Sequence, residues 1–173
     1  MSVLASVIIA HRGGALLGTE NSLSCIEKGI ATGADMVEVD LHLTADRQIV
    51  VCHDQKVNRT TNGKGRIEDM TLAEIQQLRL LNHDGSVSNE TIPTLEQVLE
   101  LCQGKCALLL EIKKKRDDQY PGIEALADSI VKAHGMGKRS SSNLSTTTCY
   151  LSCMPSTPAC GSRSYSSCVW GMC

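Results

Sequence analysis

The chain of 173 residues predicts an α/β fold in which short buried strands alternate with amphipathic helices. Short apolar runs recur along it, and between them lie segments with apolar residues three and four positions apart. The runs expected to form strands are residues 7–10, 36–41, 48–52 and 106–112. Because helices should cover both faces of such a sheet, we expect its strands to be parallel.

The expected helices have recognisable starting points. Three segments begin with Ser or Thr followed three residues later by Glu or Gln, the spacing of a capping box. The pairs are Ser24 with Glu27, Thr71 with Glu74 and Thr94 with Gln97. A further amphipathic helix is expected from Ile123 to about Gly135. Strand and helix therefore alternate up to residue 138.

Glu38 and Asp40 are the strongest candidate for a functional site. Side chains alternate along a strand, so these two carboxylates share the face opposite Val37, Val39 and Leu41. Two such residues are more commonly the solvated face of an antiparallel sheet, but a parallel sheet is covered on both faces. Two buried carboxylates need a cation or hydrogen-bond donors to neutralise them.

A third carboxylate is expected beside this pair. In the run ALLLEIK, Glu111 and Lys113 face the side opposite Leu108, Leu110 and Ile112. Three oxygen ligands without matching Cys or His spacing suit a hard cation better than zinc. The sequence therefore predicts a site for one divalent cation, either Mg²⁺ or Ca²⁺.

Two histidines also follow apolar runs. His11 and Arg12 precede a pair of glycines, which permit a ligand to approach the backbone closely. His53 and Asp54 follow the run 48–52. A single histidine is more commonly structural, but all of these groups end strands of one sheet and should face a common opening.

Seven sequence blocks occur in order between Ile9 and Lys113: IAHRGG, TENSL, VEVDLHLT, VVCHD, RTTNGKGRIEDMTLAEIQQL, IPTLEQVLEL and LEIK. In these blocks the chain resembles the glycerophosphodiester phosphodiesterases, and their joint occurrence is far more specific than any one of them. The resemblance implies a TIM-type (β/α) barrel. It also implies a metal-dependent hydrolase that cleaves glycerophosphodiesters to an alcohol and glycerol 3-phosphate.

The resemblance assigns roles to particular residues. It implies metal ligation by Glu38, Asp40 and Glu111, with Glu20 as a further or water-mediated ligand, acid/base catalysis by His11 and His53, and phosphate binding by Arg12 and Lys113. Such a set can neutralise the phosphate, deprotonate a nucleophile and protonate the leaving alkoxide. Which histidine begins as the base stays open.

The strands account for only about the first half of a barrel, since a complete one takes ~250 residues. From Arg139 to Cys173 there is no Asp, Glu or Lys, but there are ten Ser, four Thr and five of the nine Cys. This tail has no strand or helix period, so we expect it to supply no strands and to be disordered. We divide the chain into a barrel part, 1–138, and this Ser/Thr/Cys-rich tail.

The abrupt change in composition favours a frameshift, an unusual splice or a gene-model error as the origin of the tail. A disulfide module or a zinc site is the alternative. Its five cysteines form no CxxC pair and no histidine accompanies them, so the zinc signal is poor.

Composition limits the partners and the location. A net charge of −2 and few aromatic residues (no Phe, one Trp, three Tyr) argue against nucleic acid binding. No run approaches the ~20 apolar residues of a transmembrane helix. The N-terminus lacks a basic region typical of signal peptides, so we expect a cytoplasmic protein; a secreted or membrane-associated one stays open if the N-terminus is incomplete.

Two functions stay open. The first is metal-dependent hydrolysis of a small glycerophosphodiester whose head group the sequence does not specify. The second is a truncated, catalytically inactive fragment that at most binds a metal or a partner, because an open half barrel exposes two sheet edges. The oligomeric state is not predicted.

Overall fold

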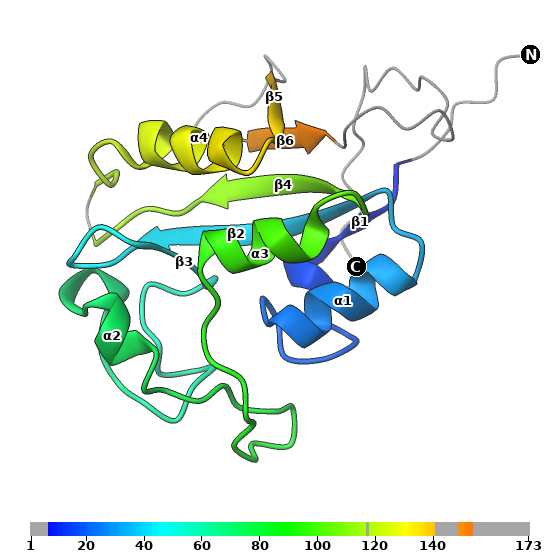
Figure 1. The fold of residues 1–173 in the computed structure, drawn as a ribbon. Coiled ribbons are helices and arrows are strands. Elements are labelled where there is room, and N and C mark those ends of the chain that lie inside the picture. Colours follow the sequence, from blue (N-terminus) through cyan, green and yellow to red (C-terminus); the bar gives the residue numbers. More distant parts are fainter. Residues whose placement is uncertain (1–6, 117, 141–148, 154–173) are drawn as a thin grey trace, which may run out of the picture.

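The computed structural model describes residues 7–116, 118–140 and 149–153. They form one six-stranded mixed sheet (Figure 1). Five of its strands follow the order β1-β2-β4-β6-β5, and the sixth strand, β3, also pairs with β2. The strands are β1 (Ile9–Ala10), β2 (Met36–Leu43), β3 (Ile49–Val51), β4 (Ala107–Ile112), β5 (Gly137–Ser140) and β6 (Cys149–Cys153).

The helices occupy the predicted segments. They are α1 (Leu23–Ala31), α2 (Leu72–Ile75), α3 (Leu95–Cys102) and α4 (Ile123–Ala133), with short 3₁₀ turns η1 (His11–Gly13) and η2 (Ile67–Asp69). Thr71 and Thr94 form complete capping boxes, as predicted. The capping box predicted at Ser24 is wrong. Ser22 caps α1 instead, and its hydroxyl accepts from the Cys25 N–H over 3.1 Å. Ser24 lies inside the helix, and its hydroxyl donates a 2.6 Å hydrogen bond to Glu90.

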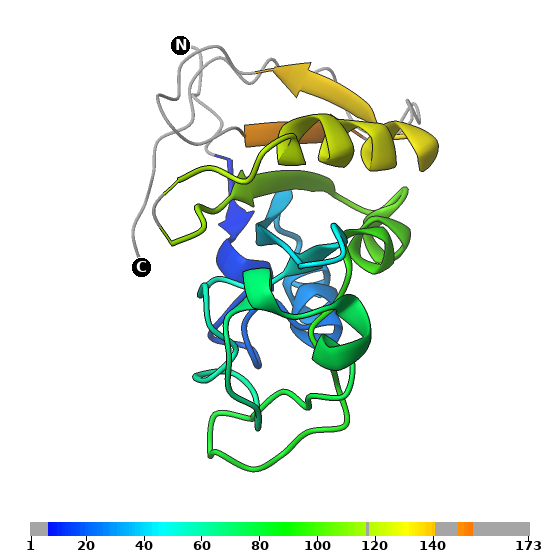
Figure 2. The ribbon, with the colours of Figure 1, turned by 90° about the vertical axis from the view of Figure 1, so that its left-hand side faces the viewer.

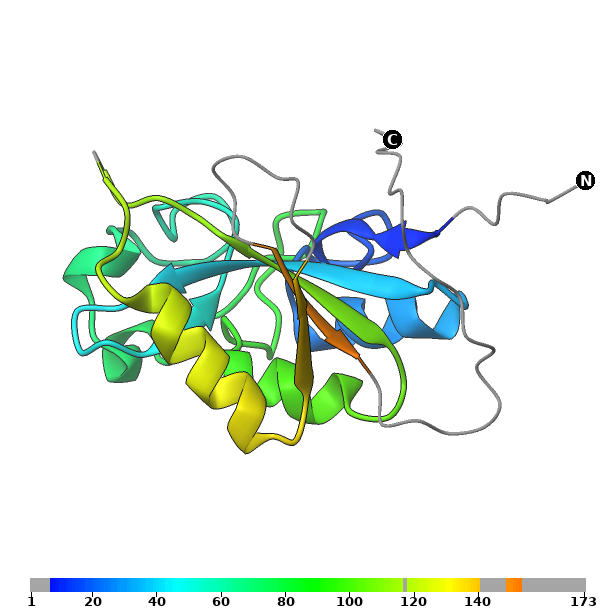
Figure 3. The same ribbon diagram turned by 90° about the horizontal axis from the view of Figure 1, so that it is seen from above.

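The main core lies between one face of the sheet and helices α1, α3 and α4 (Figure 3). The predicted alternation is confirmed: one set of strand side chains is buried against these helices. That set consists of Val37, Val39, Leu41, Leu108, Leu110 and Ile112. The opposite face of β2 and β4 is left for Glu38, Asp40 and Glu111.

The predicted parallel pairing is confirmed for β1 with β2 and for β2 with β4. Asp40 and Glu111 are register partners in the second pair, which places their side chains next to each other. For residues 48–52 the parallel prediction is wrong, because β3 runs antiparallel to β2. The turn from Thr44 to Gln48 is too short for a parallel crossover, which needs a dozen or more residues.

The expectation that the tail supplies no strand is wrong for β6. Cys149–Cys153 pairs antiparallel with β4, and β5, which spans the predicted boundary at 138, pairs with β6. These pairings rest on backbone hydrogen bonds to a strand edge, which require no alternation of side chains. Residues 141–148 and 154–173 lie outside the described residues, so the disorder and origin of the tail stay predictions.

The connection between β3 and α3 packs around a second, smaller core. This connection extends from the sheet on the side away from α4 (Figures 1 and 2). This core consists of Val50, Cys52, Val57, Ile67, Ile75, Leu80 and Ile92. The connection carries Asp54 and Arg59, which form an ion pair, and it brings Arg59 to Glu20 in the loop before α1. None of the described helices is long and apolar enough to cross a membrane.

Candidate active site

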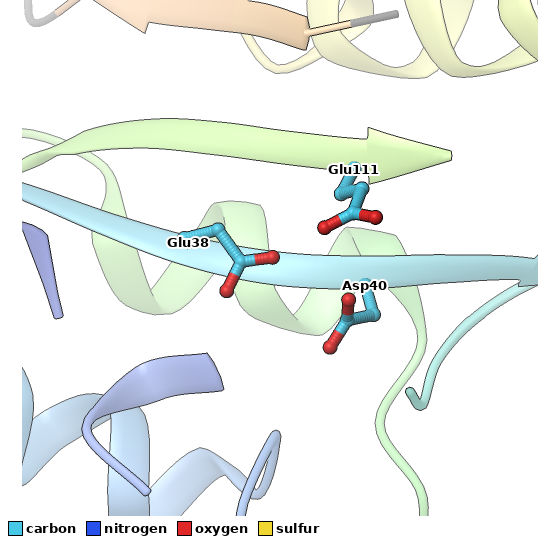
Figure 4. A group of neighbouring side chains, drawn as sticks. All are labelled: Glu38, Asp40 and Glu111. Carbon is cyan, nitrogen blue, oxygen red and sulfur yellow. The ribbon is translucent and has the colours of Figure 1, made fainter. Parts of the chain in front are cut away.

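Three carboxylates converge on one face of the sheet. Glu38 and Asp40 come from β2 and Glu111 from β4, and Figure 4 shows Glu111 reaching toward β2. One oxygen atom of each lies within 4.8 Å of the others. The side chains of Glu38 and Asp40 are buried, while 26% of that of Glu111 is exposed. The predicted convergence is confirmed, and the cluster could hold a metal ion.

The loop after β1 brings His11 and Arg12 to this cluster. Arg12 has a left-handed backbone (φ 51°), and its N–H donates a 2.7 Å hydrogen bond to Glu38 Oε2. His11 Nε2 lies 3.8 Å from the same oxygen, and 56% of the imidazole side chain is exposed. The loop approaches α1 so closely that a Cβ on Gly29 would collide with the carbonyl oxygen of Gly13. Gly13 and Gly29 therefore allow the loop to pack closely against the helix.

Donors surround Asp40. Asn21 Nδ2 donates to Asp40 Oδ2 over 2.8 Å, and Lys113 Nζ lies 2.9 Å from Asp40 Oδ1 and 2.6 Å from Glu111 Oε1. Arg12 Nε lies 3.9 Å from Asp40 Oδ2. The predicted placement of Lys113 beside the carboxylates is confirmed, and its ammonium neutralises part of their charge. Sequence reasoning missed Asn21, although it belongs to the TENSL block.

Glu38 is the least neutralised member of the cluster. Its Oε1 is buried and has no hydrogen-bond partner within the described part of the chain. Burial, reinforced by repulsion from Asp40, raises the pKa of Glu38 to about 8. The ligand atoms that the three carboxylates offer are all oxygens, and one of them, Glu38 Oε1, is buried without a hydrogen-bond partner among the described residues. Such a set suits a hard divalent cation. The residues present therefore fit the predicted metal.

His53 belongs to a chain of charged contacts. Its Nδ1 lies 2.7 Å from Asp54 Oδ1, and Asp54 pairs in turn with Arg59. Arg59 also holds Glu20, whose Oε1 lies 3.2 Å from Arg12 Nη1. Glu20 is thus paired with two arginines and lies outside the group of three carboxylates. Sequence reasoning missed Arg59, although it is the first residue of the RTTNGKGRIEDMTLAEIQQL block, because a loop arginine carries no periodic signal.

His42 is a second residue that the sequence did not single out. It shares a strand face with Glu38 and Asp40, and this i, i+2, i+4 spacing was the available signal. Burial lowers the pKa of His42 to about 4, so the ring is neutral at pH 7. Its Nε2 must donate to the His53 carbonyl (3.2 Å), which leaves Nδ1 to accept from the Tyr120 hydroxyl (2.8 Å). His42 therefore fixes the backbone at His53.

We expect the metal-free protein to lose stability as pH rises from about 5 to about 8. Glu38 ionises near ~4.3 when unfolded but near 8 when folded. Its contribution to stability is therefore full below pH ~4.3 and is lost as pH rises toward 8, by at most about 1.4 kcal/mol per pH unit. Urea unfolding in the presence of a chelator measures this slope. Glu38→Gln should flatten it, and equal slopes in both proteins would contradict the assignment.

Asn21 should stabilise the fold through its amide and through its backbone. It is buried with φ at 59°, a left-handed conformation that Gly adopts freely and Ala does not. Asn21→Gly removes the side-chain contacts with Asp40 without straining the backbone and should cost about 1–3 kcal/mol, together with about 0.4–1 kcal/mol for the greater freedom of glycine in the unfolded chain. Asn21→Ala adds about 1–2 kcal/mol of backbone strain. Urea unfolding of both variants separates the two contributions, and an alanine variant as stable as the glycine variant would exclude the backbone one.

The chain matches known proteins over most of its described part. The profile of the Glycerophosphoryl diester phosphodiesterase family matches residues 11–139. A glycerophosphodiester phosphodiesterase of Caldanaerobacter subterraneus is 36% identical over 137 residues, covering 79% of this chain and 56% of the relative. The chain spans about half the length of the curated relatives it matches.

Solved structures agree with this assignment. A phosphodiesterase of Oleispira antarctica, in complex with the product sn-glycerol-3-phosphate, superposes with a TM-score of 0.64 at 33% identity, covering 76% of this chain and 53% of that one. A glycerophosphodiester phosphodiesterase from Agrobacterium tumefaciens gives a TM-score of 0.66 at 28% identity, with coverages of 76% and 54%. The fold resembles part of the TIM barrel of these enzymes, as predicted. With its family profile, relatives and fold in agreement, the chain belongs to the glycerophosphoryl diester phosphodiesterase family.

Proposed function

We propose that the protein hydrolyses glycerophosphodiesters to an alcohol and glycerol 3-phosphate with the help of one Mg²⁺ or Ca²⁺ ion. The observation that carries this proposal is the convergence of Glu38, Asp40 and Glu111 within 4.8 Å, beside His11 and Arg12, in a chain of this family. The glycerol 3-phosphate bound to the Oleispira relative supports the choice of substrate class.

In this proposal the three carboxylates hold the cation, which supplies positive charge against the phosphate as negative charge develops. Arg12 contacts the phosphate with its guanidinium, whose orientation Glu20 and Asp40 restrain. Lys113, held between Asp40 and Glu111, adds a second positive charge on the same side. Glu20 acts on the cation at most indirectly, because two arginines already occupy its oxygens.

The two histidines move the protons. The neighbouring hydroxyl of glycerol attacks phosphorus and gives its proton to one imidazole, while the other protonates the departing alkoxide. Water then opens the cyclic phosphate with the two roles exchanged. His53 donates its Nδ1–H to Asp54, so its Nε2 lone pair is free to take a proton. His11 is exposed beside Glu38 and can exchange protons with substrate or water.

A second candidate function is metal binding without turnover. It is favoured by the sheet of the described residues, in which β1 is an end strand, because the closed sheet of a barrel would give β1 and the His11 loop a second neighbouring strand. A misplacement of ~1 Å can cost about 10²-fold in rate.

One experiment separates the two. The 173-residue protein, stripped of metal, is given Mg²⁺ or Ca²⁺ with glycerophosphocholine, glycerophosphoethanolamine or glycerophosphoinositol, and release of glycerol 3-phosphate is followed. Metal-dependent release supports hydrolysis. Calorimetric metal binding without release supports the second candidate, and absence of both overturns the proposal.

A further inference from the structure

We infer that Arg59 is a positioning residue that orients His53 through Asp54 and Arg12 through Glu20. The consequences for turnover rest on the proposed function, but the geometry of the imidazole can be tested without it. Arg59 lies, like His53 and Asp54, on the connection between β3 and α3.

The guanidinium of Arg59 engages two carboxylates at once. Its Nε and Nη2 donate to Asp54 over 2.7 and 3.1 Å, and its Nη1 and Nη2 donate to Glu20 over 3.0 and 2.7 Å. A planar fork can make both bidentate contacts, whereas a lysine ammonium is a single point of charge. The arrangement therefore specifically requires arginine.

The first arm ends at His53. Asp54 Oδ1 lies 2.7 Å from His53 Nδ1 and also accepts from Arg59. Since a carboxylate can only accept, the contact places the proton of the neutral ring on Nδ1. Hydrogen bonding by Arg59 lowers the pKa of Asp54 to about 2, so Asp54 stays charged at neutral pH. Without Arg59 the Asp54 side chain, 31% of which is exposed, would lose the partner that holds both of its oxygens.

The second arm ends at Arg12. Glu20 bridges Arg59 and Arg12, with 3.2 Å between its Oε1 and Arg12 Nη1. Burial opposes the charge on Glu20, but the two arginines outweigh it and lower its pKa. The chain Arg12–Glu20–Arg59–Asp54–His53 therefore joins the proposed phosphate contact to one of the proposed proton carriers.

The backbone around Arg59 is itself well held. Thr61 Oγ1 donates to the Val57 carbonyl over 2.7 Å, and Asn58 Oδ1 accepts from the Gly65 N–H over 3.0 Å. Thr60 and Thr61 are buried. Because the backbone is already fixed, forming these contacts costs the rotamer freedom of the Arg59 side chain but little further backbone entropy.

Nitrogen NMR of the histidine rings, at a pH where they are neutral, tests the first arm. A His53→Gln variant identifies the His53 signals. The native protein should show protonated Nδ1 and unprotonated Nε2 at His53. Arg59→Ala and Arg59→Lys should both shift the population toward protonated Nε2, while exposed Arg79→Ala, the matched control, should not. An unchanged His53 tautomer in folded Arg59→Lys overturns the inference, even if Arg59→Ala fails to fold.

Kinetics test the coupling. Arg59→Ala and Asp54→Asn should each lower kcat/KM by about 10- to 100-fold, the usual effect of losing a residue that orients a site group. The double variant should lose much less than the product of the two, because both act through His53. Glu20→Gln should raise KM more than it lowers kcat and leave the His53 tautomer unchanged. A double variant whose loss in kcat/KM equals the product of the two single losses would overturn the inference. A native protein without turnover would contradict the proposed function alone, because the NMR comparison would still decide the role of Arg59.

Discussion

Replacement of Asp40 by Asn, or of Glu38 by Gln, should abolish metal-dependent hydrolysis and leave the fold largely intact. Both carboxylates are buried, and each substitution keeps the shape of the side chain while removing the charge that would hold the cation. Loss of one transition-state donor typically costs about 10²–10³-fold in rate, and loss of the ion should exceed that. Calorimetry with Mg²⁺ and Ca²⁺ and the glycerol 3-phosphate assay measure both effects.

The matched control for these variants is Glu100→Gln. Glu100 is an exposed carboxylate of α3, so its neutralisation should change neither affinity nor rate. Undiminished affinity for both cations in the Asp40→Asn and Glu38→Gln proteins would show that Asp40 and Glu38 are not metal ligands.

Removal of either imidazole should lower turnover while metal binding survives. We expect His11→Ala and His53→Ala each to reduce kcat by about 10²–10⁴-fold, the usual worth of a positioned acid or base. Neither histidine belongs to the carboxylate cluster, so calorimetric affinity for the cation should stay near that of the native protein.

His134→Ala provides the control for the histidine variants. His134 follows the last residue of α4, and its ring is hydrogen-bonded to the Ile130 carbonyl and not to any described residue of the site. Its kcat should be unchanged. Near-native turnover of glycerophosphocholine by either His11→Ala or His53→Ala would remove that histidine from the mechanism.

The sheet face carrying the site was predictable because it depends on local alternation. Val37, Val39 and Leu41 face the helices, which directs Glu38 and Asp40 to the other side whatever the rest of the chain does. The direction of β3 was predicted wrongly, because the prediction relied on the alternation of strands and helices and ignored the short turn before residue 49.

Asn21 and Arg59 show why other parts of the site escaped prediction. Each is a polar loop residue whose importance lies in a partner far away in the sequence, Asp40 for Asn21 and Glu20 for Arg59. No periodicity marks such contacts. They become visible only when the loops are folded against the sheet.

Within the described residues, β6 departs from the prediction for the tail. Composition gave no sign that Cys149–Cys153 would pair with β4, because its pairing uses the backbone of a strand edge. A segment without alternating apolar and polar residues therefore does not form a strand with one buried face, but it can still form an edge strand.

The short β2–β3 turn makes much of the site local in sequence. His53 is 13 residues beyond Asp40 (53 − 40), and the backbone N–H of Cys52 donates to the Asp40 carbonyl over 2.9 Å. The entropy lost on closing a loop rises with its length, so the contact between Cys52 and Asp40, closed by one short hairpin, forms at little entropic cost. Glu111 is 71 residues from Asp40 (111 − 40). Bringing Glu111 to Glu38 and Asp40 therefore accounts for most of the loop-closure entropy that is lost when the three carboxylates assemble.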